Sequence, residues 1–288
     1  RSFSVVPIGV QFSKLPLISW AAVMPNTDID KVALMWTENS VASTDIKFKN
    51  VTLTGNFENY NVSQTDILPT VGYSATTASL APTTMEHLIT TSDGTQHAFV
   101  QAGNKQFCSS ASSTVNNIGL MWTYSTDGTN WICGGQLSGD VTNLMYASAT
   151  KDSAGNIYVV YSVAADGANI AYSTYYRKLT KGVGSTWTIG TAEQVLNASG
   201  GGIGYSYSVI KAQDDSRLWM ASRYFDGINY QISVYYSDTL VDSPTWNLST
   251  SSLGTASPSN TDHFPLIVRF GNRIGATYAA QFPAATQR

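Results

Sequence analysis

Charged side chains are scarce in this 288-residue chain, in which Asp, Glu, Lys and Arg together make up 12%. That share is about half of the usual one in soluble domains. The net charge is −3, and the basic residues are scattered along the sequence. Because no basic stripe is present to follow a phosphate backbone, we expect no nucleic-acid partner. No apolar run reaches the roughly 18 residues that a bilayer-spanning helix needs, so we expect no membrane span.

Residues that carry common metal and catalytic chemistry are also few. The three histidines, His87, His97 and His263, show no metal-ligand spacing. The acidic loops at 152–156 and 214–217 lack the alternating oxygen ligands and distal Glu of a calcium loop, so hairpin turns explain them. No Gly-x-Ser-x-Gly elbow and no phosphate-binding glycine loop occurs. We therefore expect neither a metal nor another cofactor.

Cysteine is nearly absent, with only Cys108 and Cys133, which lie 25 residues apart. A disulfide between them would stabilise the fold by about 3.5 kcal/mol in the loop-entropy model. Two buried free thiols are the alternative, and the sequence leaves both open. The chain begins at Arg1 without an initiator Met or a signal-peptide pattern, so we expect a processed or excised product.

Aromatic and small polar residues take the place of charge. The chain has 7 Trp, 16 Tyr and 10 Phe, and 43% of its residues are hydrophobic, so it can form a substantial core and is not disordered. The most informative stretch runs from Trp122 to Trp131. It begins as a strand and then turns at Asp127-Gly128, because Gly tolerates a positive φ and Asp can accept hydrogen bonds from nearby backbone N–H groups. Ser125 precedes this turn and Trp131 follows it.

The spacing Ser125-x-Asp127-Gly128-x-x-Trp131 resembles a shortened Asp-box, the repeat of sialidase-like β-propellers. It lacks one residue of the usual Ser-x-Asp-x-Gly-x-Thr-Trp pattern. In that family the box pins a hairpin on the outer part of a blade, so the resemblance implies a fold and a structural turn. The sialidase Arg-Ile-Pro motif is absent, since the equivalent early stretch reads Val6-Pro7-Ile8.

Partial copies of this stretch recur along the chain. Tyr-Ser pairs at 124, 172 and 236 precede Trp131, Trp187 and Trp246, whose spacings are 56 and 59 residues. Turn centres near Gly94, Gly155, residue 216 and residue 271 are spaced by 61, 61 and 55 residues. A fixed period of this length carried by short strands predicts a β-propeller.

We therefore predict an all-β chain forming a single propeller of five four-stranded blades, with no helix of three turns. The predicted repeats cover residues 17–68, 85–137, 143–196, 205–255 and 262–288. The N-terminal segment 2–12 is predicted to complete the last blade and close the ring.

The innermost strand of each blade would line the axis, and its entry end would open where propellers usually bind ligands. Aromatic residues at these entries are candidates for binding, because their faces stack on sugar rings: Trp20, Tyr146, Tyr205 and Tyr207. Two acid–His pairs at the same rim are candidate catalytic groups: Glu86 with His87, and Asp262 with His263. Packing of the Tyr and Trp side chains between blades is the alternative interpretation.

Two classes of function remain open. The sequence favours a non-catalytic extracellular or cell-surface module that recognises a glycan or a surface protein. The alternative is a polysaccharide-degrading enzyme, a sialidase-like glycoside hydrolase or a lyase, using the acid–His rim. Four glycosylation sequons, which fit a glycoprotein, start at Asn50, Asn61, Asn197 and Asn247.

Overall fold

A computed structural model describes the backbone of thirteen segments: 17–25, 31–39, 44–52, 65–66, 88–103, 118–138, 147–164, 172–184, 186–196, 207–213, 216–225, 230–256 and 264–279. Every regular element in these segments is a β-strand, which confirms the predicted all-β class. All strand pairs are antiparallel neighbours in one of five sheets. Consecutive strands of each sheet pair with each other as in a meander, except that β12 and β13 both pair with β11.

The first two sheets, here called blades 1 and 2, have four strands each. Blade 1 consists of β1 (Leu17–Pro25), β2 (Lys31–Asn39), β3 (Thr44–Thr52) and β4 (Thr65–Asp66). Blade 2 consists of β5 (Leu88–Thr90), β6 (Gln96–Gly103), β7 (Ile118–Ser125) and β8 (Ile132–Gln136).

The next two sheets have five and four strands. Blade 3 consists of β9 (Ala147–Lys151), β10 (Ile157–Ala164), β11 (Tyr172–Lys181), β12 (Trp187–Ile189) and β13 (Glu193–Leu196). Blade 4 consists of β14 (Tyr207–Gln213), β15 (Arg217–Phe225), β16 (Tyr230–Ser237) and β17 (Trp246–Ala256). Blade 5 is described as a hairpin of β18 (Phe264–Phe270) and β19 (Arg273–Ala279).

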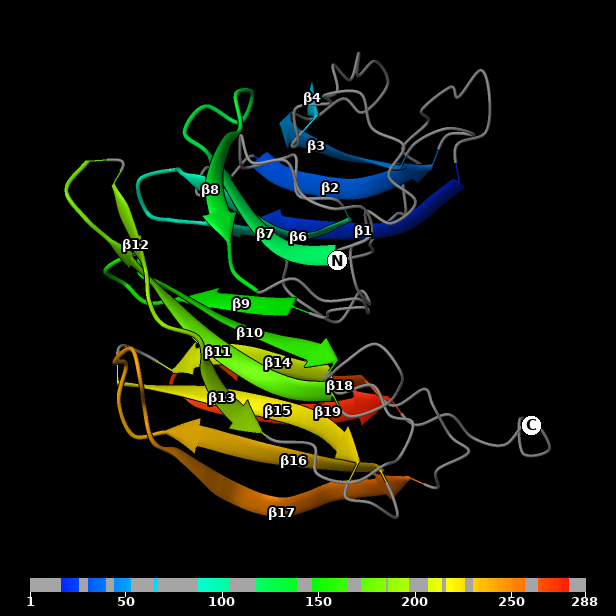
Figure 1. Ribbon diagram of the computed structural model, residues 1–288, viewed down its shortest axis with the longest axis vertical. Helices are drawn as coiled ribbons and strands as arrows, with labels where there is room; N and C mark the ends of the chain where they lie inside the picture. The colour runs from blue at the N-terminus through cyan, green and yellow to red at the C-terminus, as the bar shows by residue number, and fades with distance from the viewer. Residues whose placement is uncertain are drawn as a thin grey trace.

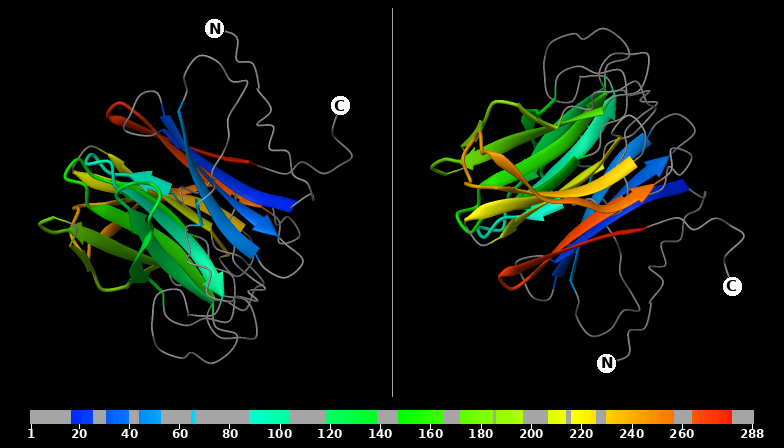
Figure 2. Two further views of the ribbon diagram at one scale, coloured as in Figure 1. Left: turned by 90° about the horizontal axis from the view of Figure 1, so that it is seen from above. Right: turned by 90° about the horizontal axis from the view of Figure 1, so that it is seen from below.

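The first strands of the five sheets pack side by side in chain order. β1 contacts β5, β5 contacts β9, β9 contacts β14, and β14 contacts β18. Figure 1 shows the sheets succeeding one another from β1 to β19, and Figure 2 shows them fanning out from this inner row. This arrangement is that of a β-propeller, so the predicted fold is confirmed. Five blades and a ring closed by residues 2–12, which lie outside the described segments, remain predictions.

Hydrophobic cores fill the spaces between consecutive blades. Between blades 2 and 3, Phe99, Leu120 and Trp122 pack against Ala149 and Val159. The equivalent core between blades 3 and 4 joins buried side chains of both sheets: Tyr158, Val160, Tyr176, Ile210, Ala212, Leu218 and Met220. Side chains alternate between the two faces of a strand, so each blade presents one face to the preceding blade and the other to the following one.

Polar side chains of the inner strands also join neighbouring blades. Ser148 Oγ accepts a hydrogen bond from the backbone N–H of Ile210 at 3.3 Å, and Thr150 Oγ1 accepts one from Ala212 at 3.1 Å. Both acceptors belong to β9 and both donors to β14. The abundance of Ser and Thr in the sequence therefore satisfies backbone groups between sheets, where each buried N–H needs a partner.

Two sequence expectations need correction in blade 3. Blade 3 is predicted to have four strands, but its outer strand is interrupted at Gly190, so β12 and β13 pair separately with β11 and the sheet has five strands. The Tyr172-Ser173 copy begins β11, whereas Ser125 and Ser237 end β7 and β16. The Tyr172-Ser173 pair is therefore not equivalent to the other two pairs. β11 is ten residues long and ends at Lys181, so the residue before the outer turn is Lys181 and not a serine. The three tryptophans do occupy equivalent places at the start of the outer strands.

Candidate functional site

Two of the predicted rim residues lie in described inner strands. Tyr207 is the first residue of β14, and Trp20 lies within β1; only the backbone of these two is described. The other six lie outside the described residues: Glu86, His87, Tyr146, Tyr205, Asp262 and His263. How these side chains point is therefore not described, and the proposed rim stays a prediction.

Three of these residues directly precede described strands in the sequence. β5 starts at Leu88, β9 at Ala147 and β18 at Phe264, directly after His87, Tyr146 and His263 in the sequence. β1 and β9 run in the same direction in Figure 1, as expected for the first strands of successive meanders. We call the side where the inner strands start the entry face, and the side of the β5–β6, β9–β10 and β14–β15 turns the turn face.

Arg223 is a residue that the sequence analysis did not single out as a site residue. It lies near the end of β15, its backbone pairs with Tyr207 across the ladder, and its side chain is fully buried. Directly opposed residues of antiparallel strands share one face of the sheet. Arg223 therefore places a cation beneath the entry face, beside a predicted binding residue. Pairing residues symmetrically on the two sides of the 214–216 turn would have predicted that Tyr207 and Arg223 lie opposite each other.

The other described arginines do not join Arg223. Arg177 Nη1 donates to the carbonyl of Gly190 at 3.2 Å, and Arg269 Nε donates to that of Gly271 at 2.7 Å. The guanidinium of Arg217 lies over the ring of Tyr236 at 5.0 Å. Arg217 and Arg223 stand six residues apart on β15, which is roughly 20 Å along a strand.

The turn face is built from tight turns whose carboxylates accept several hydrogen bonds. Asp127 Oδ1 accepts the N–H groups of Thr129 at 2.8 Å and Asn130 at 2.7 Å, and the hydroxyl of Ser125 at 3.0 Å. The N–H of Gly128, which has a φ of 70°, donates to Ser125 Oγ at 2.9 Å. The bonds from Asn130, then Thr129, hold the pKa of Asp127 below its usual value. These hydrogen bonds are all made within the turn itself, and its structural role stays a prediction.

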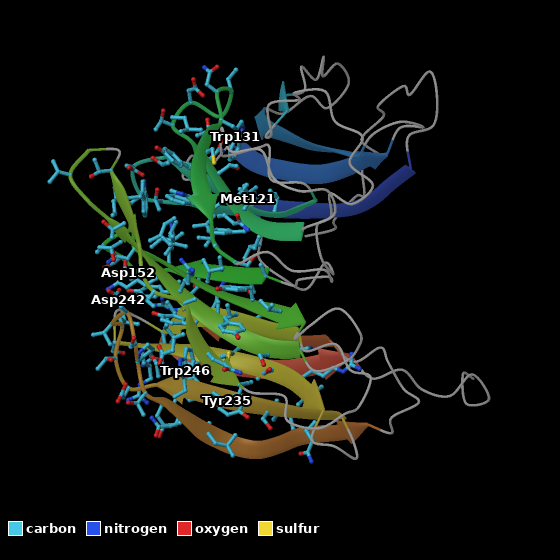
Figure 3. The ribbon with its side chains drawn as sticks, in the orientation of Figure 1. Met121, Trp131, Asp152, Tyr235, Asp242 and Trp246 are labelled. Atoms are coloured by element: carbon cyan, nitrogen blue, oxygen red, sulfur yellow. The ribbon has the colours of Figure 1, made fainter. Side chains whose placement is uncertain are left out.

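Trp131 follows this turn and lies directly before β8 (Figure 3), and Cys133 in that strand is disulfide-bonded. Cys108, the other cysteine of the sequence, lies outside the described residues, so the predicted pairing stays a prediction. Asn247 lies in β17 and is partly exposed, and Asn50 lies in β3. Asn61 and Asn197 fall outside the described segments.

His97 is a titratable group that is fully buried between blades 2 and 3. Its Nδ1 lies 3.2 Å from Nε1 of Trp122, which donates to it, so Nε2 carries the proton and faces Thr91 Oγ1 at 3.4 Å. Thr91 in turn donates to Asp93 at 2.6 Å, and Asp93 pairs with Lys181 of blade 3 at 2.5 Å. Burial lowers the pKa of His97 from 6.5 to about 3, and Lys181 adds to this.

The His97 contact has counterparts in the next two blades. Tyr158 OH donates to Asp152 Oδ2 at 2.7 Å, and Trp219 Nε1 donates to Gln213 Oε1 at 2.6 Å. In all three blades the second strand contributes one ring that bonds to a residue six positions earlier, beside the first turn. The bond fixes each turn against its own sheet. Figure 3 shows Asp152 and Trp246 on this side of the molecule.

Within the described segments no group of three or more His, Cys, Asp or Glu residues is placed to hold a metal ion. The same segments contain no helix that is long and apolar enough to cross a membrane.

The fold is similar to that of solved carbohydrate-related proteins. An α-L-arabinofuranosidase from Lactobacillus brevis aligns over 93% of this chain and 85% of its own, with 13% identity and a TM-score of 0.53. An endo-arabinase from Bacteroides thetaiotaomicron aligns over 92% and 89%, with 13% identity and a TM-score of 0.46. A lectin of Aleuria aurantia in complex with α-methyl-L-fucoside aligns over 92% and 79%, with 13% identity and a TM-score of 0.48. No family model and no curated protein matches the chain by sequence.

Proposed function

We propose that this chain is an extracellular or cell-surface propeller that binds carbohydrate at its entry face. The observation that carries the proposal is the Tyr207–Arg223 pair, which combines an aromatic position at the start of an inner strand with a buried cation directly across the ladder. The aromatic residues would stack on sugar rings at this face. The α-L-arabinofuranosidase shares the fold, and its substrate class fits a carbohydrate ligand here.

The Ser125–Trp131 turn supports the same class of molecule. Its hydrogen bonds fit the role of a shortened Asp-box, because one carboxylate ties Ser125, Thr129 and Asn130 together, and Gly128 donates to the hydroxyl of Ser125. We propose that it is a structural blade turn of that kind, with no part in ligand binding. Its position beside the outer strand β8 fits this role.

The experiment is a binding measurement on the intact chain with a panel of immobilised neutral and acidic polysaccharides. Tyr207→Ala is expected to weaken binding at least tenfold, and Tyr146→Ala to weaken it as well. Asp127→Ala, on the turn face, is the matched control and should bind normally. Equal binding by Tyr207→Ala and the parent protein to every polysaccharide retained would refute the entry face as the site.

A polysaccharide-degrading enzyme is the second candidate, since the acid–His pairs Glu86–His87 and Asp262–His263 precede β5 and β18 directly in the sequence. Enzymatic activity would be established if the protein released reducing sugar, or unsaturated sugar that absorbs ultraviolet light, from the retained polysaccharide. Glu86→Gln and Asp262→Asn should then abolish release while leaving binding intact. Binding without release would establish the non-catalytic function.

A further inference from the structure

The outer hairpin of blade 3, which β11 and β12 form, is attached to blade 2 by side chains. Trp187 of β12 packs edge-on against His97 at 4.8 Å and against Trp122 at 5.5 Å. Lys181, the last residue of β11, pairs with Asp93 of blade 2 at 2.5 Å. β12 and the strands of blade 2 belong to separate sheets. The hairpin can therefore leave blade 2 without breaking a ladder between strands.

The break in the outer strand makes the end of this hairpin a small unit. β12 pairs with β11 over three residue pairs, from Leu179 to Lys181, and the outer strand is then interrupted at Gly190. The ladder between β10 and β11 ends at Leu179. In blade 4, by contrast, Trp246 begins an outer strand of eleven residues. A movement that separates Trp187 from blade 2 can therefore be confined to the part of blade 3 beyond Leu179.

The hydrogen bonds of His97 suit only the neutral ring. Its Nδ1 accepts the indole N–H of Trp122 at 3.2 Å, and its Nε2 faces Thr91 Oγ1 at 3.4 Å. A protonated imidazole donates from both nitrogens. Its Nδ1–H would then face the N–H of Trp122 inside a buried interface, and that hydrogen bond would be lost. Trp187 covers both rings, so water cannot reach them while the hairpin is in place.

The charged groups around His97 oppose one another. Burial lowers the pKa of His97 to about 3, Asp93 in the β5–β6 turn raises it, and Lys181 of β11 and Lys151 of β9 lower it. Tyr124, which stacks on the imidazole at 6.1 Å, is uncharged in acid. β12 contributes no titratable side chain. Departure of the hairpin would remove the covering indole and one opposing cation, while Asp93 would stay beside the imidazolium.

We propose that the β11–β12 hairpin is an acid-sensitive clasp, in which protonation of His97 separates Trp187 from blade 2 while the ladders within the sheets stay intact. Between pH 6.5 and 3 the equilibrium shifts toward the released clasp by about tenfold for each unit that the pH falls, because the exposed ring binds its proton more tightly than the buried one. We expect the released form to dominate below about pH 4. Release would expose the indoles of Trp122 and Trp187 and leave the inner strands in place.

The test follows the intact chain, labelled with 5-fluorotryptophan, by ¹⁹F NMR from pH 7 to pH 3. Trp187 and Trp246 are assigned by the signals lost in Trp187→Phe and Trp246→Phe, and exposure is measured as the difference in chemical shift between H₂O and D₂O. Trp187 is expected to gain this difference in acid while Trp246 and the far-ultraviolet circular dichroism stay unchanged. Trp246 is the internal control, because it packs on Tyr176 at 5.8 Å and not on a histidine.

Two variants test the trigger and the contact separately. His97→Gln removes the titrating group, so Trp187 should stay covered down to pH 3. Trp187→Phe keeps His97 but weakens the contact with blade 2, so release should occur at a higher pH than in the parent protein. In that variant the signal of Trp122, assigned by its loss in Trp122→Phe, reports the release. Because Trp187→Phe retains a ring at this position, it also tests the clasp if His97→Gln does not fold.

Three results would overturn the clasp. Exposure of Trp187 and Trp246 at one pH, together with loss of the circular dichroism signal, would show global unfolding. A Trp187 signal that stays protected at pH 3 would show that the hairpin is not released. Release at the parent's pH in folded His97→Gln, or at the parent's pH or below in Trp187→Phe, would show that another group controls it. Polysaccharide binding at pH 7 is measured apart from all of these, so the clasp and the proposed function fail independently.

Discussion

The interface between blades 2 and 3 and the interface between blades 3 and 4 have one design with different chemistry. Each contains a ring bonded beside the first turn and an indole inserted from the following blade. In the first interface the bonded ring is His97. Its Nε2 faces Thr91, which donates to Asp93, and Asp93 forms an ion pair with Lys181. In the second it is Tyr158, which donates straight to Asp152.

The lesson of the comparison is that the repeat preserves geometry and not residue type. A ring and an acceptor six residues apart are enough to fix the turn, so imidazole, phenol and indole all serve. Their response to pH differs, however, because only imidazole titrates near neutrality. The acid stability of this propeller should therefore depend on the interface between blades 2 and 3.

Removing an inserted indole should have the largest effect. Trp187→Ala is expected to lower the free energy of unfolding by about 3 kcal/mol, because it leaves a cavity against His97 and Trp122. Trp219→Ala should cost about 1 kcal/mol, since the described contacts of that ring are with Tyr236 and one hydrogen bond to Gln213. Urea denaturation measures both. Equal losses would mean that Trp219 is packed as closely as Trp187.

The second prediction concerns acid. The pKa of His97 is about 3 in the folded chain against 6.5 for the free side chain, so below pH 6.5 the unfolded state binds the proton first. The stabilisation that neutral His97 contributes is complete above pH 6.5 and falls by about 1.4 kcal/mol per pH unit as the pH drops toward 3. At pH 4 the loss is roughly 3 kcal/mol by the same relation.

His97→Gln should make the free energy of unfolding less dependent on pH between 6.5 and 4, whatever the substitution does to stability at pH 7. The charged groups around the ring are Asp93, Lys181 and Lys151. Burial alone would raise the pKa of Asp93, but hydrogen bonds from Lys181, Thr91 and Thr95 outweigh it and hold that pKa below 3.8. The stability that ionised Asp93 contributes is therefore lost only at a pH lower than the range in which His97 titrates. Denaturant midpoints of both proteins across this pH range make the measurement. Parallel curves would show that His97 is not the titrating group.

Tyr158→Phe tests the counterpart in blade 3 and should have a smaller effect. The variant removes the hydroxyl that donates to Asp152, while the backbone N–H and side-chain amide of Asn156 continue to donate to the same carboxylate. The expected cost is about 1 kcal/mol and should not change between pH 6.5 and 4. Thermal unfolding at both pH values measures it. A pH-dependent cost would contradict the assignment of acid sensitivity to His97.

The sequence alone predicts much of this fold, because hairpin turns and tryptophans recur at a regular period. The turns predicted near Gly94, Gly155 and residue 271 are found between β5 and β6, between β9 and β10, and between β18 and β19. The interblade contacts were not predictable, since Trp187 and His97 are 90 residues apart and meet only when two sheets pack. The burial of Arg223 was not predictable for the same reason, because it depends on how the sheets pack. Its pairing with Tyr207, by contrast, follows from the position of the 214–216 turn.

The smallest effect is expected from Asp127→Ala, which tests whether the turn face is structural throughout. The carboxylate accepts bonds from Thr129, Asn130 and Ser125, but it is fully exposed, so water replaces part of what is lost. The variant should melt a few degrees lower at pH 7 and should bind polysaccharide as the parent protein does. Because those bonds hold the pKa of Asp127 below 3.8, its contribution is present above that pH and fades as the pH falls further. Asp127→Asn keeps an acceptor oxygen and should recover part of the melting temperature. Weaker binding by a well-folded Asp127→Ala would show instead that this face touches the ligand.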